Sequence, residues 1–185
     1  MTMACSTRCC VILVALVAVL AYFGLQKTTV SFEFSVSDIK SDPQTVFELF
    51  RDPKNLPKIH PMLTEGRDKV EVLSTEEQEG GVEVVHFILP SYRYFQTSST
   101  WVIDPTSLSI ESKVIGPFGI MSGHVKRTFV PDESDGRSVR TKMTESTEVT
   151  SPQILTFAAN SIIDIHLEMV QTLKRVVESR QMEQV

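Results

Sequence analysis

Residues 151–179 read SPQILTFAANSIIDIHLEMVQTLKRVVES, and this stretch decides the fold. Apolar side chains recur along it every three or four residues, which places them on one stripe of an α-helix. Ser151 is a suitable N-cap, and Pro152 suits a first helical turn. The pattern therefore predicts one long helix from Ser151 to about Ser179. Its stripe consists of Leu155, Ala159, Ile162, Met169, Leu173 and Val177, interrupted near the centre by the polar His166.

A long amphipathic helix needs a broad apolar surface, and the preceding chain supplies strands. Residues 32–37 alternate between apolar and polar side chains, as a half-buried strand does. Asp42 and Pro43 predict a helix start, Asp52-Pro53 predicts its end, and the proline-rich residues 55–61 predict short helical turns. Short turns then separate six further strands, which favours an antiparallel sheet and an α+β fold. These strands are expected near residues 70–72, 82–89, 92–103, 108–114, 121–130 and 139–149.

Two pieces of this layout resemble a known superfamily. Residues 42–63, DPQTVFELFRDPKNLPKIHPML, look like an opening helix pair, in which a helix is followed by D-P-x-x-x-P-x-x-H-P. Residues 116–119, GPFG, with Gly123 and Phe129, are similar to a glycine–proline hairpin before a sixth strand. Together with the terminal helix, they resemble the START-like or helix-grip superfamily, also called SRPBCC. Its members include the birch-pollen-allergen proteins, polyketide cyclase and dehydratase-like proteins, and coenzyme-Q-binding START-domain proteins.

The resemblance covers residues 30 to about 180 and implies the fold and the kind of ligand. It implies a helix-grip fold, in which a curved seven-stranded antiparallel sheet surrounds the long C-terminal helix. The cavity between sheet and helix usually takes an apolar or amphipathic ligand, which fits the small residues near the start of the predicted helix, Ala158, Ala159 and Ser161. Many relatives have no membrane segment, whereas this chain begins with an apolar run.

That run, residues 9–25, reads CCVILVALVAVLAYFGL and contains no charged residue. Its length is at the short end for a membrane-spanning helix, and it also overlaps the apolar core of a secretory signal. We therefore divide the chain into an N-terminal hydrophobic anchor (or signal peptide) at 1–27 and a ligand-binding domain at 28–185. A retained anchor predicts a single-pass protein of an endomembrane or the plasma membrane. A cleaved signal predicts secretion.

Charge and composition exclude several classes of function. Residues 1–27 hold two of the 18 basic residues and no acidic one, which leaves 16 basic and 23 acidic residues for the domain. This excess of negative charge argues against a nucleic-acid surface. All three cysteines precede residue 11, so the domain has no disulfide or cysteine nucleophile. The four histidines lack metal-ligand spacing, and we expect a monomer with neither metal nor cofactor.

Three polar residues are candidates for the chemistry of the cavity. His166 lies at the middle of the helix stripe, where it either bonds a ligand headgroup, acts as a general acid or base, or is a core histidine paired with a strand residue. Glu145 shares strand parity with Met143 and Val149 and should face inward, unless a bulge or an edge position turns it outward. Arg93 and Arg127 either pair with Glu145 or lie at a wet rim.

Apolar residues are expected to line the cavity. Phe34, Phe95, Trp101 and Met121 are predicted walls, with plain core packing as the alternative. Phe118 is placed on a loop by its Pro and Gly neighbours, where it acts as a lid, enters a bilayer interface or is an ordinary exposed side chain. The full set of predicted ligand-binding residues is Phe34, Phe95, Trp101, Phe118, Met121, Ile162, His166 and Met169.

These features favour a membrane-anchored domain that binds or transfers a lipid or another hydrophobic small molecule. The motifs of the common hydrolases, nucleotide-binding proteins and zinc proteases are absent from the sequence. An alternative is a cyclase- or dehydratase-like enzyme that uses His166 with Glu145 on an apolar substrate. A third interpretation is an interaction module whose own side chains fill the cavity.

Overall fold

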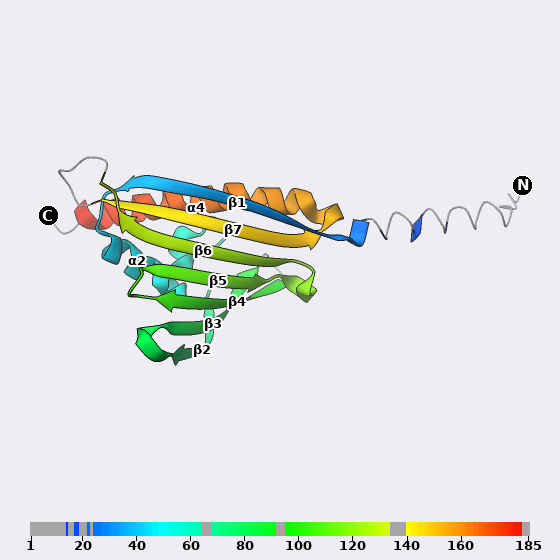
Figure 1. The fold of residues 1–185 in the computed structure, drawn as a ribbon, viewed down its shortest axis with the longest axis horizontal. Coiled ribbons are helices and arrows are strands. Elements are labelled where there is room, and N and C mark those ends of the chain that lie inside the picture. Colours follow the sequence, from blue (N-terminus) through cyan, green and yellow to red (C-terminus); the bar gives the residue numbers. More distant parts are fainter. Residues whose placement is uncertain are drawn as a thin grey trace, which may run out of the picture.

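Seven antiparallel strands form one sheet in the order β1-β7-β6-β5-β4-β3-β2, as the α+β prediction requires. The computed structural model describes residues 14, 17, 18, 22, 24–63, 68–91, 95–133 and 140–182. Figure 1 shows the long helix α4 lying along the β1–β7 side of this sheet. The strands are β1 (Lys27–Ile39), β2 (Glu71–Glu77), β3 (Glu83–Ser91), β4 (Phe95–Asp104), β5 (Ser109–Ile115), β6 (Ser122–Pro131) and β7 (Thr141–Pro152).

The short helices between β1 and β2 begin and end where the sequence predicts. The Asp42 side chain accepts a hydrogen bond from the Thr45 N–H, and Pro43 occupies the first turn of α2 (Pro43–Arg51). Asp52 ends α2 and caps the next turn. The other helical segments are η1 (Pro53–Asn55), α3 (Leu56–Ile59), η2 (Glu79–Gly81), η3 (Pro117–Gly119), η4 (Gln153–Leu155) and α4 (Thr156–Met182).

The predicted start of the long helix is wrong. Ser151 and Pro152 belong to β7, because they pair with Thr28 and Lys27 of β1. The Ser151 hydroxyl is buried and, within the described part of the chain, has no hydrogen-bond partner, so it caps no helix. The helical region begins with η4, and α4 follows from Thr156. Sheet pairing therefore overrides the local Ser-Pro signal.

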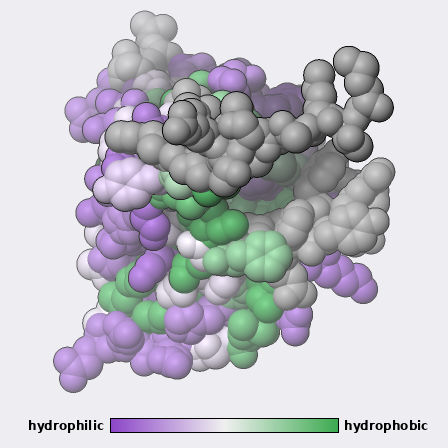
Figure 2. Space-filling view, turned by 90° about the vertical axis from the view of Figure 1, so that its right-hand side faces the viewer, coloured by the Kyte–Doolittle hydropathy of each residue, from purple (hydrophilic) through white to green (hydrophobic). Residues whose placement is uncertain are grey.

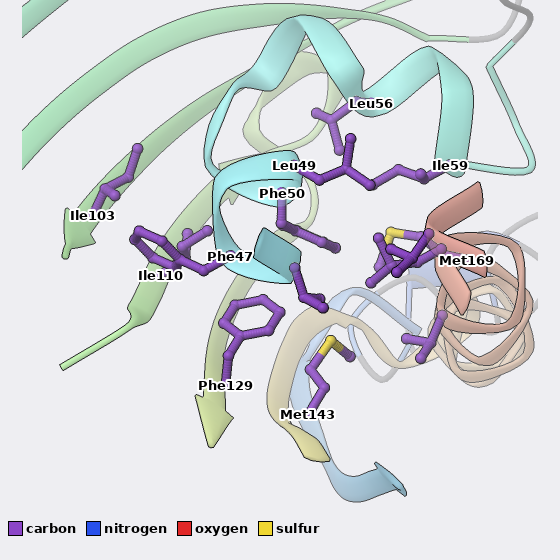
Figure 3. Close-up of a cluster of buried hydrophobic side chains, with 14 of the residues drawn as sticks. Phe47, Leu49, Phe50, Leu56, Ile59, Ile103, Ile110, Phe129, Met143 and Met169 are labelled. Atoms are coloured by element: carbon purple, nitrogen blue, oxygen red, sulfur yellow. The ribbon is translucent and has the colours of Figure 1, made fainter. Parts of the chain in front are cut away.

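The hydrophobic core lies between the sheet, the short helices and the second half of α4. Phe47 and Phe50 of α2 pack on Phe129 of β6, with ring centroids 5.9 and 5.8 Å away. Figure 3 shows these side chains converging with Met143 and Met169. The α4 residues in this core are Met169, Val170, Leu173 and Val177. The core thus occupies one end of the space between helix and sheet.

Most of the apolar run at residues 9–25 lies outside the described residues. The predicted anchor or signal is therefore not placed. In the part of the chain that the structure describes, no helix is both long and apolar enough to cross a membrane.

Candidate ligand pocket and its buried ion pair

The polar centre of the domain begins with alternation along β7. Thr141, Met143, Glu145, Thr147 and Val149 are all buried, whereas Ser146 and Glu148 between them are exposed. Successive side chains of a strand point to opposite faces, so Glu145 faces the interior with its apolar neighbours. The inward orientation predicted for Glu145 is confirmed.

Arg127 of β6 is the ion-pair partner of Glu145. The two residues are opposite each other in the β6–β7 register, and Arg127 Nε lies 2.6 Å from Glu145 Oε2. The guanidinium carbon also lies 4.9 Å from the centroid of the Phe50 ring, and Nη1 is 3.5 Å from the Ser112 hydroxyl. A buried charge pair is better tolerated when its other polar atoms also have partners, and the Ser112 hydroxyl and the Phe50 ring contribute such contacts to this guanidinium.

Glu145 also joins the sheet to α4. Its Oε1 accepts hydrogen bonds from the Thr147 hydroxyl at 3.0 Å and from Nδ1 of His166 on α4. Burial alone raises the pKa of Glu145, but the Arg127 charge and the His166 and Thr147 contacts outweigh it and lower the pKa from 4.5 to about 2. Glu145 is therefore an ionised carboxylate at neutral pH, and it can only accept hydrogen bonds.

This arrangement orients the His166 ring. Because an ionised carboxylate accepts from Nδ1, Nδ1 carries the proton, and Nε2 of the neutral ring is an acceptor. The edge-on ring of Phe32, with its centroid 6.0 Å away, packs against the imidazole. No described residue bonds to Nε2, so this atom is available to a ligand. His166 is thus both paired with a strand residue and part of a pocket wall.

The pocket lies between the sheet and the first half of α4. Its volume is about 220 Å³, and its wall includes the exposed Ser122, so it opens at the surface. This volume is below the roughly 300–1,000 Å³ common for ligand sites. The described lining is mostly apolar and consists of Thr97, Val114, Gly116, Met121, Ser122, Gly123, Val125, Thr147, Val149, Ile162 and His166.

The structure brings together only some of the residues predicted to line a cavity. Met121, Ile162 and His166 line this pocket. Trp101 and Met169 lie instead in the hydrophobic core, where Trp101 packs between the rings of Phe50 and Phe87.

The other predicted site residues lie elsewhere or are not described. Phe34 is half-buried beside the core. Phe118 is 85% exposed on η3, as its loop position predicts. The side chain of Phe95 and all of Arg93 lie outside the described residues.

Sequence reasoning missed several residues around the site. Thr147 is two residues after Glu145 on the same strand, so strand alternation could have placed it on the same inner face. Gly123 lines the pocket on the inner face of β6, and a Cβ there meets Glu148 O at 3.8 Å and Val114 Cβ at 3.9 Å, both ordinary contacts. A side chain at position 123 therefore fits the backbone and occupies the pocket.

His60 is a second titratable group near this centre, and it is partly buried. Its Nδ1 accepts the Met62 N–H at 3.3 Å. Desolvation is the largest cause that lowers the pKa of His60 from 6.5 to about 4; the protonated form of His166 and the Arg127 charge act in the same direction, and Glu145 acts against them. His60 is therefore neutral at physiological pH. No group of three or more potential metal ligands occurs among the described residues.

Comparisons with known proteins identify the fold. No protein-family model matches the chain, and no curated protein does. A norcoclaurine synthase point mutant from Thalictrum flavum, in complex with a transition-state analogue, matches with a TM-score of 0.58 and 14% identity over 84% of this chain and 98% of that one. Norcoclaurine synthase with dopamine and hydroxybenzaldehyde matches with a TM-score of 0.57 and 13% identity over 85% of this chain and 91% of that one.

A further solved structure, Ara h 8.0201, matches with a TM-score of 0.53 and 15% identity over 82% of this chain and 99% of that one. Similarity at these identities concerns the fold and not the ligand. It agrees with the strand order, the pair of short helices and the long terminal helix described above. The chain therefore has the helix-grip fold.

Proposed function

We propose that this protein binds a small hydrophobic or amphipathic molecule, such as a lipid, between α4 and the sheet. The observation that carries the proposal is a mostly apolar pocket whose wall includes the imidazole of His166, a ring that Glu145 orients through Nδ1. Apolar pockets with a few placed polar groups are the usual form of small-molecule sites. The volume suits a compact ligand, or one chain of a larger lipid whose remainder leaves through the mouth.

The proposal includes a membrane location for the domain. The uncharged run at residues 9–25 supports a single-pass anchor, with secretion after signal cleavage as the alternative. An anchored, monomeric domain would bind or carry its ligand next to the membrane that supplies it. Residues 19–21, Val-Leu-Ala, suit a signal-peptide cleavage site. Sequencing the N-terminus of the mature protein tests this part, because a chain that begins at Tyr22 would overturn retention of the anchor.

Filling the pocket tests ligand binding directly. The probe is the fluorescent dye anilinonaphthalene sulfonate, displaced by n-octanol or by n-butylbenzene. Gly123→Leu should abolish dye binding and displacement, because the new side chain occupies the pocket without backbone strain. Ser146→Leu, on the outer face of β7, is the matched control and should bind as the parent does. Equal binding by both variants would show that this pocket is not the site.

One observation favours an enzyme as the second candidate. Glu145 orients the His166 ring through Nδ1, and no described residue bonds to Nε2, which is the arrangement of a general base oriented by a carboxylate. In a cyclase-like reaction, Nε2 would take a proton from the bound substrate, and Glu145 would stabilise the imidazolium. Glu145 does not line the pocket, so its role would be to position His166. Turnover lost in His166→Gln with ligand binding retained would favour this candidate.

A further inference from the structure

Large apolar side chains are exposed together at one end of the domain. They are Phe118 and Ile120 at the η3 loop, Ile154 and Phe157 at the start of the helical C-terminal region, and Leu25 before β1. Their exposed fractions run from 44% for Ile120 to 85% for Phe118. Figure 2 faces this end and shows hydrophobic side chains gathered on it. We call these five residues the apolar end.

Residues close in sequence to the apolar end line the pocket. Gly116 and Met121 flank the η3 loop and line the pocket, and the Gly116 N–H donates to Met121 O at 2.9 Å to close that loop. Ile162, little more than one helical turn after Phe157, lines the pocket from the opposite side. A ligand that enters between η3 and α4 therefore passes these exposed side chains.

The conformation of Phe118 is a separate observation about this end. Its φ of 57° lies in the left-handed region, which bulky side chains rarely adopt. Glycine adopts this conformation without the steric cost that a Cβ imposes. The loop thus holds a large aromatic ring outward in a strained conformation, and such strain often marks a functional position.

Chain continuity brings the N-terminal apolar run to the apolar end. The uncharged run at 9–25 ends at Leu25, inside this patch. The next residue, Gln26, accepts a hydrogen bond from the Gln153 N–H at 2.8 Å, and an added Cβ on Gly24 lies 3.7 Å from Ile154 Cβ. The run therefore leaves the domain against η4, beside the pocket mouth. Because the apolar run adjoins the apolar end, both can contact the same apolar surface.

We propose that the apolar end is a membrane-docking surface, seated on the boundary between headgroups and hydrocarbon of the bilayer. The ligand would then pass between bilayer and pocket without crossing water, a consequence that rests on the proposed function. Hydrophobic contact should dominate, because none of the five residues is charged and residues 28–185 carry 16 basic against 23 acidic side chains. Docking should therefore need no anionic lipid.

Tryptophan depth measurement tests the docking. The full chain is reconstituted in phosphatidylcholine vesicles that contain brominated lipid, as Phe118→Trp, as Phe157→Trp and as the control Leu73→Trp. Leu73 is 57% exposed on β2, at the opposite edge of the sheet from β1. The parent chain supplies the background, because its single tryptophan, Trp101, is buried. Bromine should quench the introduced indole of Phe118→Trp and of Phe157→Trp at least three-fold more than that of the control, with or without phosphatidylserine.

The outcomes separate docking from ligand binding. Equal quenching in the three variants would overturn the docking surface. Contact of the apolar end with a second copy of the chain would also overturn the docking surface. In that case bromine would not quench the introduced indoles, and cross-linking through the apolar end would increase with protein density. Adding Gly123→Leu to Phe118→Trp should abolish dye binding but retain the quenching. If the pocket binds no ligand while the introduced indole of Phe118→Trp is still quenched, the proposed function fails and the docking surface stands.

Discussion

At the scale of single residues, the centre of the protein is a carboxylate with no exposed surface. Glu145 is 0% exposed, and its two oxygens are shared among Arg127, Thr147 and His166. Its position follows from strand alternation, but Arg127 comes from a neighbouring strand and His166 from a helix 21 residues later. Parity predicts which face a residue occupies, and it does not predict which of two arginines lies opposite.

Removing one partner of the Arg127–Glu145 ion pair should destabilise the domain more than replacing both partners. Arg127→Met leaves the Glu145 charge buried, and we expect a loss of about 3–5 kcal/mol in the free energy of unfolding. The double variant Arg127→Met, Glu145→Gln should lose clearly less than the sum of the two single variants. Urea unfolding measures each value, with the exposed Lys126→Met as a control expected to change stability by under about 0.5 kcal/mol. Additive losses would mean that the two residues are not coupled.

His60 should make stability fall on mild acidification. The unfolded chain protonates this ring near pH 6.5, whereas the folded ring stays neutral to about pH 4. Between these values the unfolded state binds more protons, so lowering the pH costs stability, up to about 3 kcal/mol. His60→Asn retains an acceptor near the Nδ1 position and should remove this dependence of stability on pH.

Urea midpoints measured from pH 7 to 4 check the His60 prediction. His124→Asn, at a half-exposed position on β6, is the control and should retain the slope. Below about pH 4.5 a second loss is expected in all variants that keep Glu145, because its folded pKa is about 2. A slope unchanged in His60→Asn would assign the acid sensitivity to another group.

At the scale of elements, α4 has two halves with different partners. From Met169 onward its buried side chains pack in the core with α2, α3 and the sheet. Before that, Ile162 and His166 border the pocket. In the sequence, apolar residues recur on both sides of His166 with the same helical spacing, so the pattern could not show this division. The division arises because α2 and α3, distant in sequence, fill only one end of the space under the helix.

The two halves should respond differently to a buried charge. Leu173→Asp places an unpaired carboxylate in the core, and we expect a loss of about 4–5 kcal/mol, which would unfold a marginally stable domain. Ile162→Asp faces a pocket that opens to water, so we expect a loss of about 1 kcal/mol together with loss of dye binding. Thermal melts measure both variants. If Ile162→Asp proved as damaging as Leu173→Asp, the pocket would be closed and packed in solution.

His166 links the element scale to recognition. His166→Leu removes the Nε2 acceptor but leaves Glu145 bonded to Arg127 and Thr147, so the domain should still fold. Octanol, whose hydroxyl can donate to Nε2, should bind more weakly by about 1–3 kcal/mol. Butylbenzene, of similar size without a donor, should bind within about two-fold of the parent. An equal loss of affinity for both ligands would show that His166 only forms part of the pocket wall.

At the scale of the whole molecule, sequence predicts the order of elements better than their contacts. Caps, prolines and alternation act within a few residues, which is why Asp42, Asp52 and the loop position of Phe118 are correctly predicted. Ser151 is mistaken because its partner, Thr28, is 123 positions earlier in the chain. Trp101 lies in the core, which is the alternative that the sequence left open, because α2 supplies the ring of Phe50 that packs against it.

The first strand should decide whether the domain folds without its N-terminal segment. β1 begins at Lys27 and pairs with β7 from Pro152 back to Thr141, closing the sheet beside α4. Removing residues 1–26 keeps every β1–β7 pair and loses one described backbone bond, from Gln153 to Gln26. We therefore expect residues 27–185 to give a folded, soluble monomer that binds octanol as the full chain does. Removing residues 1–39 deletes β1 and exposes the edge of β7, so that chain should aggregate or stay unfolded. Circular dichroism and light scattering distinguish the two. A truncated chain 27–185 that fails to fold would show that the N-terminal segment is part of the domain.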